Sequence, residues 1–139
     1  MSTQDSILLV DANPEDVELT LLAFSENDLG DCVRVAHGVQ EALELLFGEQ
    51  AFRPTMILLD LRFPDDAGLA VLRRIKRDWR TSMIPVVVLS PSDEAGVLEA
   101  VGLGAAGSLA KPVDFEEFLE AASGISLYWR SRRMQRERV

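Results

Sequence analysis

The sequence predicts an α/β fold in which helices cover both faces of a parallel sheet. Apolar, strand-like runs alternate five times with amphipathic helical segments along the 139 residues, an order that produces right-handed crossovers. The runs at 7–10, 56–59 and 86–89 are apolar without interruption, which is typical of strands buried on both faces. The length and the hydrophobic fraction of 47% suit one domain with a substantial core.

The first half of the chain supplies three of the expected strands, at residues 6–10, 32–36 and 56–60. Between the first two we expect a helix to about residue 27, because Asn13 is a good N-cap, Pro14 fits the first helical position and acidic residues follow. The apolar spacing of residues 39–46 predicts a second helix, which ends at Gly48.

The second half continues the alternation. Leu69, Leu72, Ile75 and Trp79 space a third helix, which is followed by a strand at 85–89 and a weaker helix at about 93–102. A strand at 107–110 then precedes a fifth helix. That helix carries its apolar face on residues 115, 118, 119, 122 and 125, and we expect it to extend through Trp129.

This (βα)₅ order predicts a flavodoxin-like three-layer sandwich with the strand order 2-1-3-4-5. Ligands of such sheets bind at the carboxyl ends of the strands, in the crevice between strands one and three. Asp11 and Asp60 end those two strands, while Ser90 and Lys111 end strands four and five. We therefore expect one convergent polar site built from two carboxylates, a hydroxyl and an ammonium.

Charge is distributed unevenly along the chain. The net charge is −9, but residues 130–139 hold five arginines and one glutamate, so residues 1–129 carry −13. Such an acidic body disfavours nucleic acid as a partner. We expect residues 1–129 to form the domain and residues 130–139 to be an Arg-rich helix end or tail. A single cysteine, Cys32, and no apolar stretch of about 20 residues predict a cytoplasmic protein with no membrane span.

The strand ends resemble those of the receiver domains of bacterial two-component response regulators. The matching segments are Ile7-Leu8-Leu9-Val10-Asp11, Leu58-Leu59-Asp60-Leu61-Arg62-Phe63-Pro64 with Gly68, Val88-Leu89-Ser90 and Ala110-Lys111-Pro112. The resemblance covers about residues 5–125. With its opening at residues 11–17, the chain looks most like stand-alone regulators, including those paired with phytochrome-type kinases.

The resemblance implies a role for each site residue. Asp60 would accept a phosphoryl group from a sensor histidine kinase, without turnover of the enzymatic kind. Asp11, Asp60 and the backbone carbonyl of Arg62 would hold Mg²⁺. Ser90 and Lys111 would bind the phosphoryl oxygens. The bond between Lys111 and Pro112 is expected to be cis.

Three departures from the family pattern support an alternative, a pseudo-receiver that acts as a phosphorylation-independent interaction module. Ala12 supplies no oxygen where the family places a second acid, so the Mg²⁺ site should be weaker, unless the amide oxygen of Asn13 compensates. Pro91 has no N–H to offer a phosphoryl group. Ser108 replaces the family's switch aromatic.

A small flavodoxin-like enzyme or nucleotide-binding protein is a third reading, which we rank lower because residues 11–16 contain no phosphate-cradling glycine. The G-x-G-x-x-G match at 102–107 closes a helix and precedes a strand, so its glycines are expected in a turn and C-cap. His37, the sole histidine, is expected at the surface. The aromatic pair Tyr128-Trp129 lies beyond the predicted core and suggests a homodimer.

Overall fold

The computed structural model describes residues 6–90, 94–125, 130 and 134. Five strands alternate with five α-helices, as expected, and two short 3-10 turns, η1 (Gly30–Cys32) and η2 (Pro64–Asp66), interrupt the loops. In chain order the elements are β1 (Ile7–Val10), α1 (Pro14–Ser25), β2 (Val33–Ala36), α2 (Val39–Phe47), β3 (Met56–Asp60), α3 (Ala67–Arg77), β4 (Val86–Ser90), α4 (Glu94–Gly102), β5 (Gly107–Ala110) and α5 (Phe115–Ile125).

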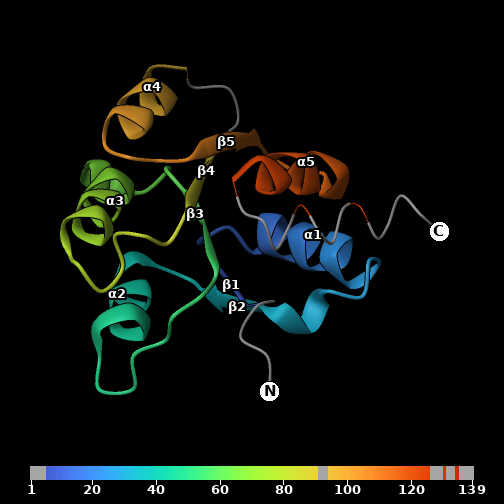
Figure 1. Ribbon diagram of the computed structural model, residues 1–139, viewed down its shortest axis with the longest axis horizontal. Coiled ribbons are helices and arrows are strands. Elements are labelled where there is room, and N and C mark those ends of the chain that lie inside the picture. Colours follow the sequence, from blue (N-terminus) through green and yellow to red (C-terminus); the bar gives the residue numbers. More distant parts are fainter. Residues whose placement is uncertain (1–5, 91–93, 126–129, 131–133, 135–139) are drawn as a thin grey trace.

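All four strand pairings are parallel, and the order β2-β1-β3-β4-β5 confirms the prediction. Helices α1 and α5 cover one face of the sheet, while α2 and α3 cover the other (Figure 1). The carboxyl ends of all five strands therefore lie at one edge of the sheet. In the described part of the chain no helix combines the length and the apolar character needed to cross a membrane.

The central strands divide their side chains between two cores. Ile7 and Leu9 of β1 pack in the cluster beneath α1 and α5, whereas Leu8 and Val10 pack in the cluster beneath α2 and α3. Strands β3 and β4 alternate in the same way, because successive side chains of a strand point to opposite faces. This two-sided burial explains why the strands appear in the sequence as uninterrupted apolar runs.

Three phenylalanine rings join α1 to α5. The ring of Phe24 meets those of Phe115 and Phe118 edge to face, at centroid distances of 5.1 and 4.8 Å. Phe24 and Phe118 are fully buried. Since aromatic pairs in this geometry add to the free energy gained by burial, they hold the first helix firmly over its face of the sheet.

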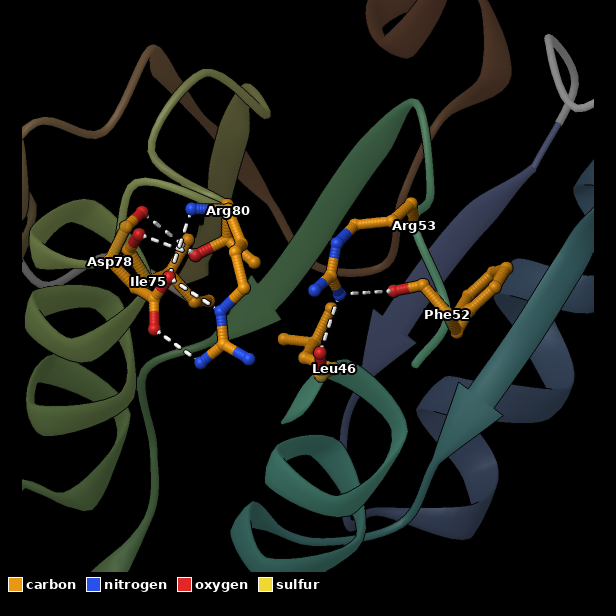
Figure 2. A network of polar contacts seen from close by, with 7 residues as sticks. Leu46, Phe52, Arg53, Ile75, Asp78 and Arg80 are labelled. Atoms are coloured by element: carbon orange, nitrogen blue, oxygen red, sulfur yellow. Dashed lines mark hydrogen bonds and ion pairs between the residues drawn. The ribbon is translucent and has the colours of Figure 1, made fainter. Parts of the chain in front are cut away.

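The prediction that the third helix includes Trp79 is wrong. Helix α3 ends at Arg77, and Trp79 is 84% exposed. The carboxylate of Asp78 accepts a hydrogen bond from the backbone N–H of Arg80 and pairs with its guanidinium at 2.7 Å (Figure 2). Hydrogen bonds from Arg80 hold the pKa of Asp78 well below its usual range. This local turn stops the helix and directs the indole outward.

Arginine also fixes the approach to β3. The guanidinium of Arg53 donates to the carbonyl of Leu46 at the end of α2, and to that of Phe52 at 3.1 Å (Figure 2). Arg53 precedes β3 and Arg80 precedes β4. Both contacts therefore stabilise the amino-terminal edge of the sheet, opposite the edge where the polar strand ends lie.

We predict that Thr81→Val destabilises the fold by about 1–2 kcal/mol. The Thr81 hydroxyl is fully buried and donates to the carbonyl of Ile75 at 2.7 Å. Valine keeps the shape of the side chain but leaves that carbonyl without this donor. Urea unfolding measures the change as a lower midpoint with an unchanged slope. The neighbouring Ser82→Ala is the control, and equal midpoints for wild type and Thr81→Val would contradict the prediction.

Candidate functional site

Strand alternation decides which polar end residues share a face of the sheet. Leu9, Leu58 and Leu109 all pack in the cluster beneath α1 and α5. Asp11, Asp60 and Lys111 each follow one of them by two residues, so they are directed to the same face. Ser90 follows Val88, which packs in the opposite cluster. The sheet therefore brings together three of the four predicted strand-end side chains, whereas Ser90 continues the alternation of the opposite cluster.

The ammonium of Lys111 lies among carboxylates. Its Nζ is 2.6 Å from Oδ2 of Asp60, 2.7 Å from Oδ2 of Asp16 and 3.0 Å from Oδ2 of Asp11. The side chains of Lys111 and Asp60 are each 5% exposed, and that of Asp11 is fully buried. The bond between Lys111 and Pro112 is cis, as predicted. A buried cation thus contacts three acidic groups from β1, α1 and β3.

Burial and pairing act against each other at these groups. Burial raises the pKa of Asp11, although the N–H of Asn13 and the ammonium of Lys111 offset part of the effect. For Lys111 burial alone would lower the pKa, but pairing with the carboxylates of Asp16, Asp60 and Asp11 outweighs the effect of burial, so the pKa is raised. Lys111 is therefore a cation throughout the physiological pH range.

The turn after β1 orients the two acids near its end. The N–H of Asn13 donates to Oδ1 of Asp11 at 2.9 Å. The side-chain oxygen of Asn13 in turn accepts from the N–H groups of Glu15 and Asp16, at 2.9 and 3.1 Å. Asn13 is thus the N-cap of α1, as predicted. Because the side-chain oxygen of Asn13 already accepts two backbone hydrogen bonds, it is directed to the start of α1 and not to the acidic site.

The loop after β3 holds the carboxylate of Asp60 in place. The N–H of Arg62 donates to Oδ1 of Asp60 at 2.9 Å, while Oδ2 contacts Lys111. Gly68, the second residue of α3, lies against this loop. A Cβ at Gly68 would lie 3.0 Å from both Cα and the carbonyl oxygen of Leu61, and 3.1 Å from the carbonyl oxygen of Asp60. A side chain at position 68 would therefore need the backbone at the end of β3 to shift by a few tenths of an ångström.

The other predicted residues differ in where they lie. Ser90 is buried at the end of β4, in register with Ala110 of β5, and Ser108 is exposed on β5. Pro91 and the pair Tyr128-Trp129 lie outside the described residues. Asp16 was considered in the sequence only as an acid of the first helical turn. Its contact with Lys111 depends on how α1 sits over the sheet, which local patterns do not report.

Comparisons with known proteins define the class. The family model of the response regulator receiver domain matches residues 7–123, so the chain belongs to this family. Its role is therefore in two-component phosphorelay signalling. Two similar solved structures are phytochrome regulators. The bacteriophytochrome response regulator AtBRR is 36% identical with a TM-score of 0.75, and the match covers 86% of this chain and 91% of that one. The phosphorylated cyanobacterial phytochrome response regulator RcpA is 31% identical with a TM-score of 0.72. That match covers 91% of this chain and 94% of RcpA.

A third similar structure is the Mn²⁺-bound form of response regulator Rcp1, 28% identical with a TM-score of 0.66 over 89% of this chain and 93% of that one. Within the described residues no group of three or more His, Cys, Asp or Glu side chains is arranged to bind a metal ion. Oδ2 of Asp11 is nonetheless buried and accepts no hydrogen bond from them. Carboxylate oxygens suit Mg²⁺, which commonly keeps several waters. The residues present therefore fit a partly hydrated divalent cation.

We predict that Gly68→Ala destabilises the protein by about 1–3 kcal/mol, because the added Cβ must displace the backbone beside Asp60. Gly124→Ala is a matched control within α5, since a Cβ there would meet none of the described residues within 4 Å outside its own helix backbone and chain neighbours. Alanine is the better helix former, so this control should stabilise the protein by up to about 1 kcal/mol. Urea unfolding of both variants measures the difference, and equal midpoints would refute the steric argument.

Proposed function

We propose that the protein receives a phosphoryl group on Asp60 from a sensor histidine kinase and passes on the signal as a phosphorylated receiver. The buried contact of 2.6 Å between Lys111 and Asp60 carries this proposal. It places a cation beside a carboxylate at the carboxyl end of β3, where parallel sheets bind ligands. The phosphorylation-independent module is not favoured, because the charged groups at the strand ends of β1, β3 and β5 are assembled.

The proposed step is an in-line displacement at phosphorus. A carboxylate oxygen of Asp60 attacks the phosphorus of a phosphohistidine, the new P–O bond forms and the P–N bond breaks. The bonding pair of electrons returns to the histidine nitrogen, which takes a proton from solvent. The N–H of Arg62 holds the plane of the carboxylate, and the ammonium of Lys111 is placed to pair with a phosphoryl oxygen. One chain accepts one group, so the protein is not a turnover enzyme.

A divalent cation, Mg²⁺ by the chemistry of the donors, would neutralise negative charge on the incoming phosphoryl group. Asp11, Asp60 and the backbone carbonyl of Arg62 would hold it. Ala12 offers no oxygen, so Asp11 and Asp60 supply one negative charge fewer than the site would have with a second acid at position 12. Ser90, buried at the end of β4, would bind a second phosphoryl oxygen through its hydroxyl.

We predict that acetyl phosphate with Mg²⁺ adds one phosphoryl group to the wild type and none to Asp60→Asn. The amide of asparagine is not a nucleophile toward phosphorus, whereas Asp60 is the carboxylate paired with Lys111. Intact-mass spectrometry measures the adduct, and EDTA should abolish it.

Asp65→Asn is the matched control, because it removes an exposed carboxylate from the loop that follows β3. It should be labelled like the wild type, and asparagine tolerates the positive φ of 59° at this position. An unlabelled wild type that also fails to bind beryllofluoride would overturn the proposal. Equal labelling of Asp60→Asn and wild type would show that the acceptor lies elsewhere.

We further propose a phytochrome-linked histidine kinase as the phosphodonor, on the basis of the similarity to AtBRR and RcpA. Phosphotransfer from purified kinases to wild type and Asp60→Asn would test this choice. A kinase of this class should label the wild type faster than an unrelated kinase does, and equal rates would contradict the choice.

We predict that the protein sediments as a homodimer and that Trp129→Ala shifts it toward the monomer. The reason is the large apolar area of the Tyr128-Trp129 pair beyond the expected core. Analytical ultracentrifugation of both proteins at equal concentration provides the measurement, with the exposed Trp79→Ala as a control for loss of an indole. Monomers for both wild type and Trp129→Ala would refute the dimer.

A further inference from the structure

Asp16 is the member of the acidic site that comes from a helix. Its Oδ2 lies 2.7 Å from Nζ of Lys111, the same nitrogen that contacts Asp11 and Asp60. The side chain is 21% exposed, so one side faces the buried site and the other faces water. Asp16 therefore lies at the solvent-exposed side of the site, whereas Asp11 and Asp60 lie at its buried side.

The fold directs this side chain to the strand ends. With Asn13 as the N-cap, Asp16 is the third residue of α1. Helical side chains lean toward the amino terminus of their helix, and the amino terminus of α1 adjoins the end of β1. Val17, the next residue, packs in the core cluster on the same face as Asp11 and Asp60. The position of Asp16 thus follows from the cap and from the packing of α1.

The site carries more negative than positive charge. The three carboxylates balance against one ammonium, which leaves a net charge of −2 when all four groups are ionised. Independently, Oδ2 of Asp11 is buried and accepts no hydrogen bond from the described residues, and it contacts the site only through its ion pair with Lys111 at 3.0 Å. A buried oxygen without a donor is a costly arrangement. Both observations favour a divalent cation held beside Lys111, the ammonium on which the three carboxylates converge in the structure.

We propose that Asp16 is a third carboxylate ligand of a divalent cation at this site, beside Asp11 and Asp60. It supplies from the first turn of α1 the negative charge that Ala12 does not supply from the end of β1. Asn13 cannot take this role while its oxygen caps the helix. The proposal rests on the proposed function only in taking the cation to be the one that assists phosphoryl transfer.

The experiment measures the binding of Mg²⁺ and Mn²⁺ alone, without a phosphodonor, by calorimetry and by the Mn²⁺ paramagnetic resonance signal. Asp16→Asn should weaken binding by roughly tenfold or more, because affinity for such cations follows the number of charged ligands. Glu15→Gln is the matched control, since it removes one negative charge from the adjacent exposed position. It should change affinity by less than about twofold, as expected for a screened surface charge.

A second measurement separates ligation from an effect through Lys111. Asp16→Asn is repeated in a Lys111→Met background. If Asp16 binds the cation directly, the loss of affinity persists there; if Asp16 acts only by holding Lys111, the loss disappears and the proposal is overturned. Circular dichroism verifies folding, and Asp16→Ser, which retains a residue favoured at helix starts, replaces any asparagine variant that fails to fold.

The remaining outcomes are also decisive. Equal affinities for Asp16→Asn and Glu15→Gln, or no binding to the wild type at millimolar cation, would overturn the role of Asp16. Labelling of Asp60 by acetyl phosphate is scored separately. Cation binding that depends on Asp16 without labelling would refute the proposed function alone, whereas labelling with cation binding independent of Asp16 would refute this inference alone.

Discussion

The buried ammonium of Lys111 is the interaction on which the functional edge of the sheet depends. It contacts carboxylates from β1, α1 and β3 within 3.0 Å, so one side chain from the end of β5 joins elements distant in sequence. Taking these charges out of water is costly, and breaking a buried ion pair by removing one partner typically costs about 3–5 kcal/mol. Lys111 therefore compensates for acidic groups that the fold could not otherwise keep so close together. The arrangement is a poor device for stability alone, since apolar residues would fill the same space at lower cost.

The remainder of the fold provides the rigid frame that this cluster requires. Apolar side chains from both faces of β1, β3 and β4 fill two separate cores, which fixes the register of the strands and hence the level at which Asp11 and Asp60 emerge. The rings of Phe24, Phe115 and Phe118 hold α1 to α5. At the opposite edge, arginine contacts with backbone and carboxylate close the turns before β3 and β4. The arginine contacts and the acidic cluster thus lie at opposite ends of the same strands.

The sequence was sufficient for nearly all of the fold, because its strongest signals are local. Apolar runs, the Asn13 cap and the glycine-bounded turns placed every strand and helix within a few residues. The third helix was predicted to include Trp79 because the apolar periodicity continues past the turn that Asp78 and Arg80 close. The contact between the Asp78 side chain and the Arg80 backbone leaves no periodic signal in the sequence. In the site, Asp11, Asp60 and Lys111 were predicted to converge and do so. That Ser90 shares the alternation of Val86 and Val88, and not that of Asp60, could have been inferred from the sequence, since residues two apart share a face. The position of Asp16 could not have been inferred from the sequence, because it depends on the long-range packing of α1.

Placing an acid on α1 has a physical consequence that an acid on β1 would not have. A strand-end carboxylate moves only with the sheet, which is held by four ladders of hydrogen bonds. A carboxylate in the first helical turn is attached to an element that packs on the sheet through side chains alone. Coulomb forces at short range in a partly buried site are strong, so any change in charge beside Lys111 acts on the amino terminus of α1 as well as on the strand ends. The aromatic contacts of Phe24 then link α1 to α5. The charge at the site is therefore coupled to the position of α1 and α5 through the side chain of Asp16.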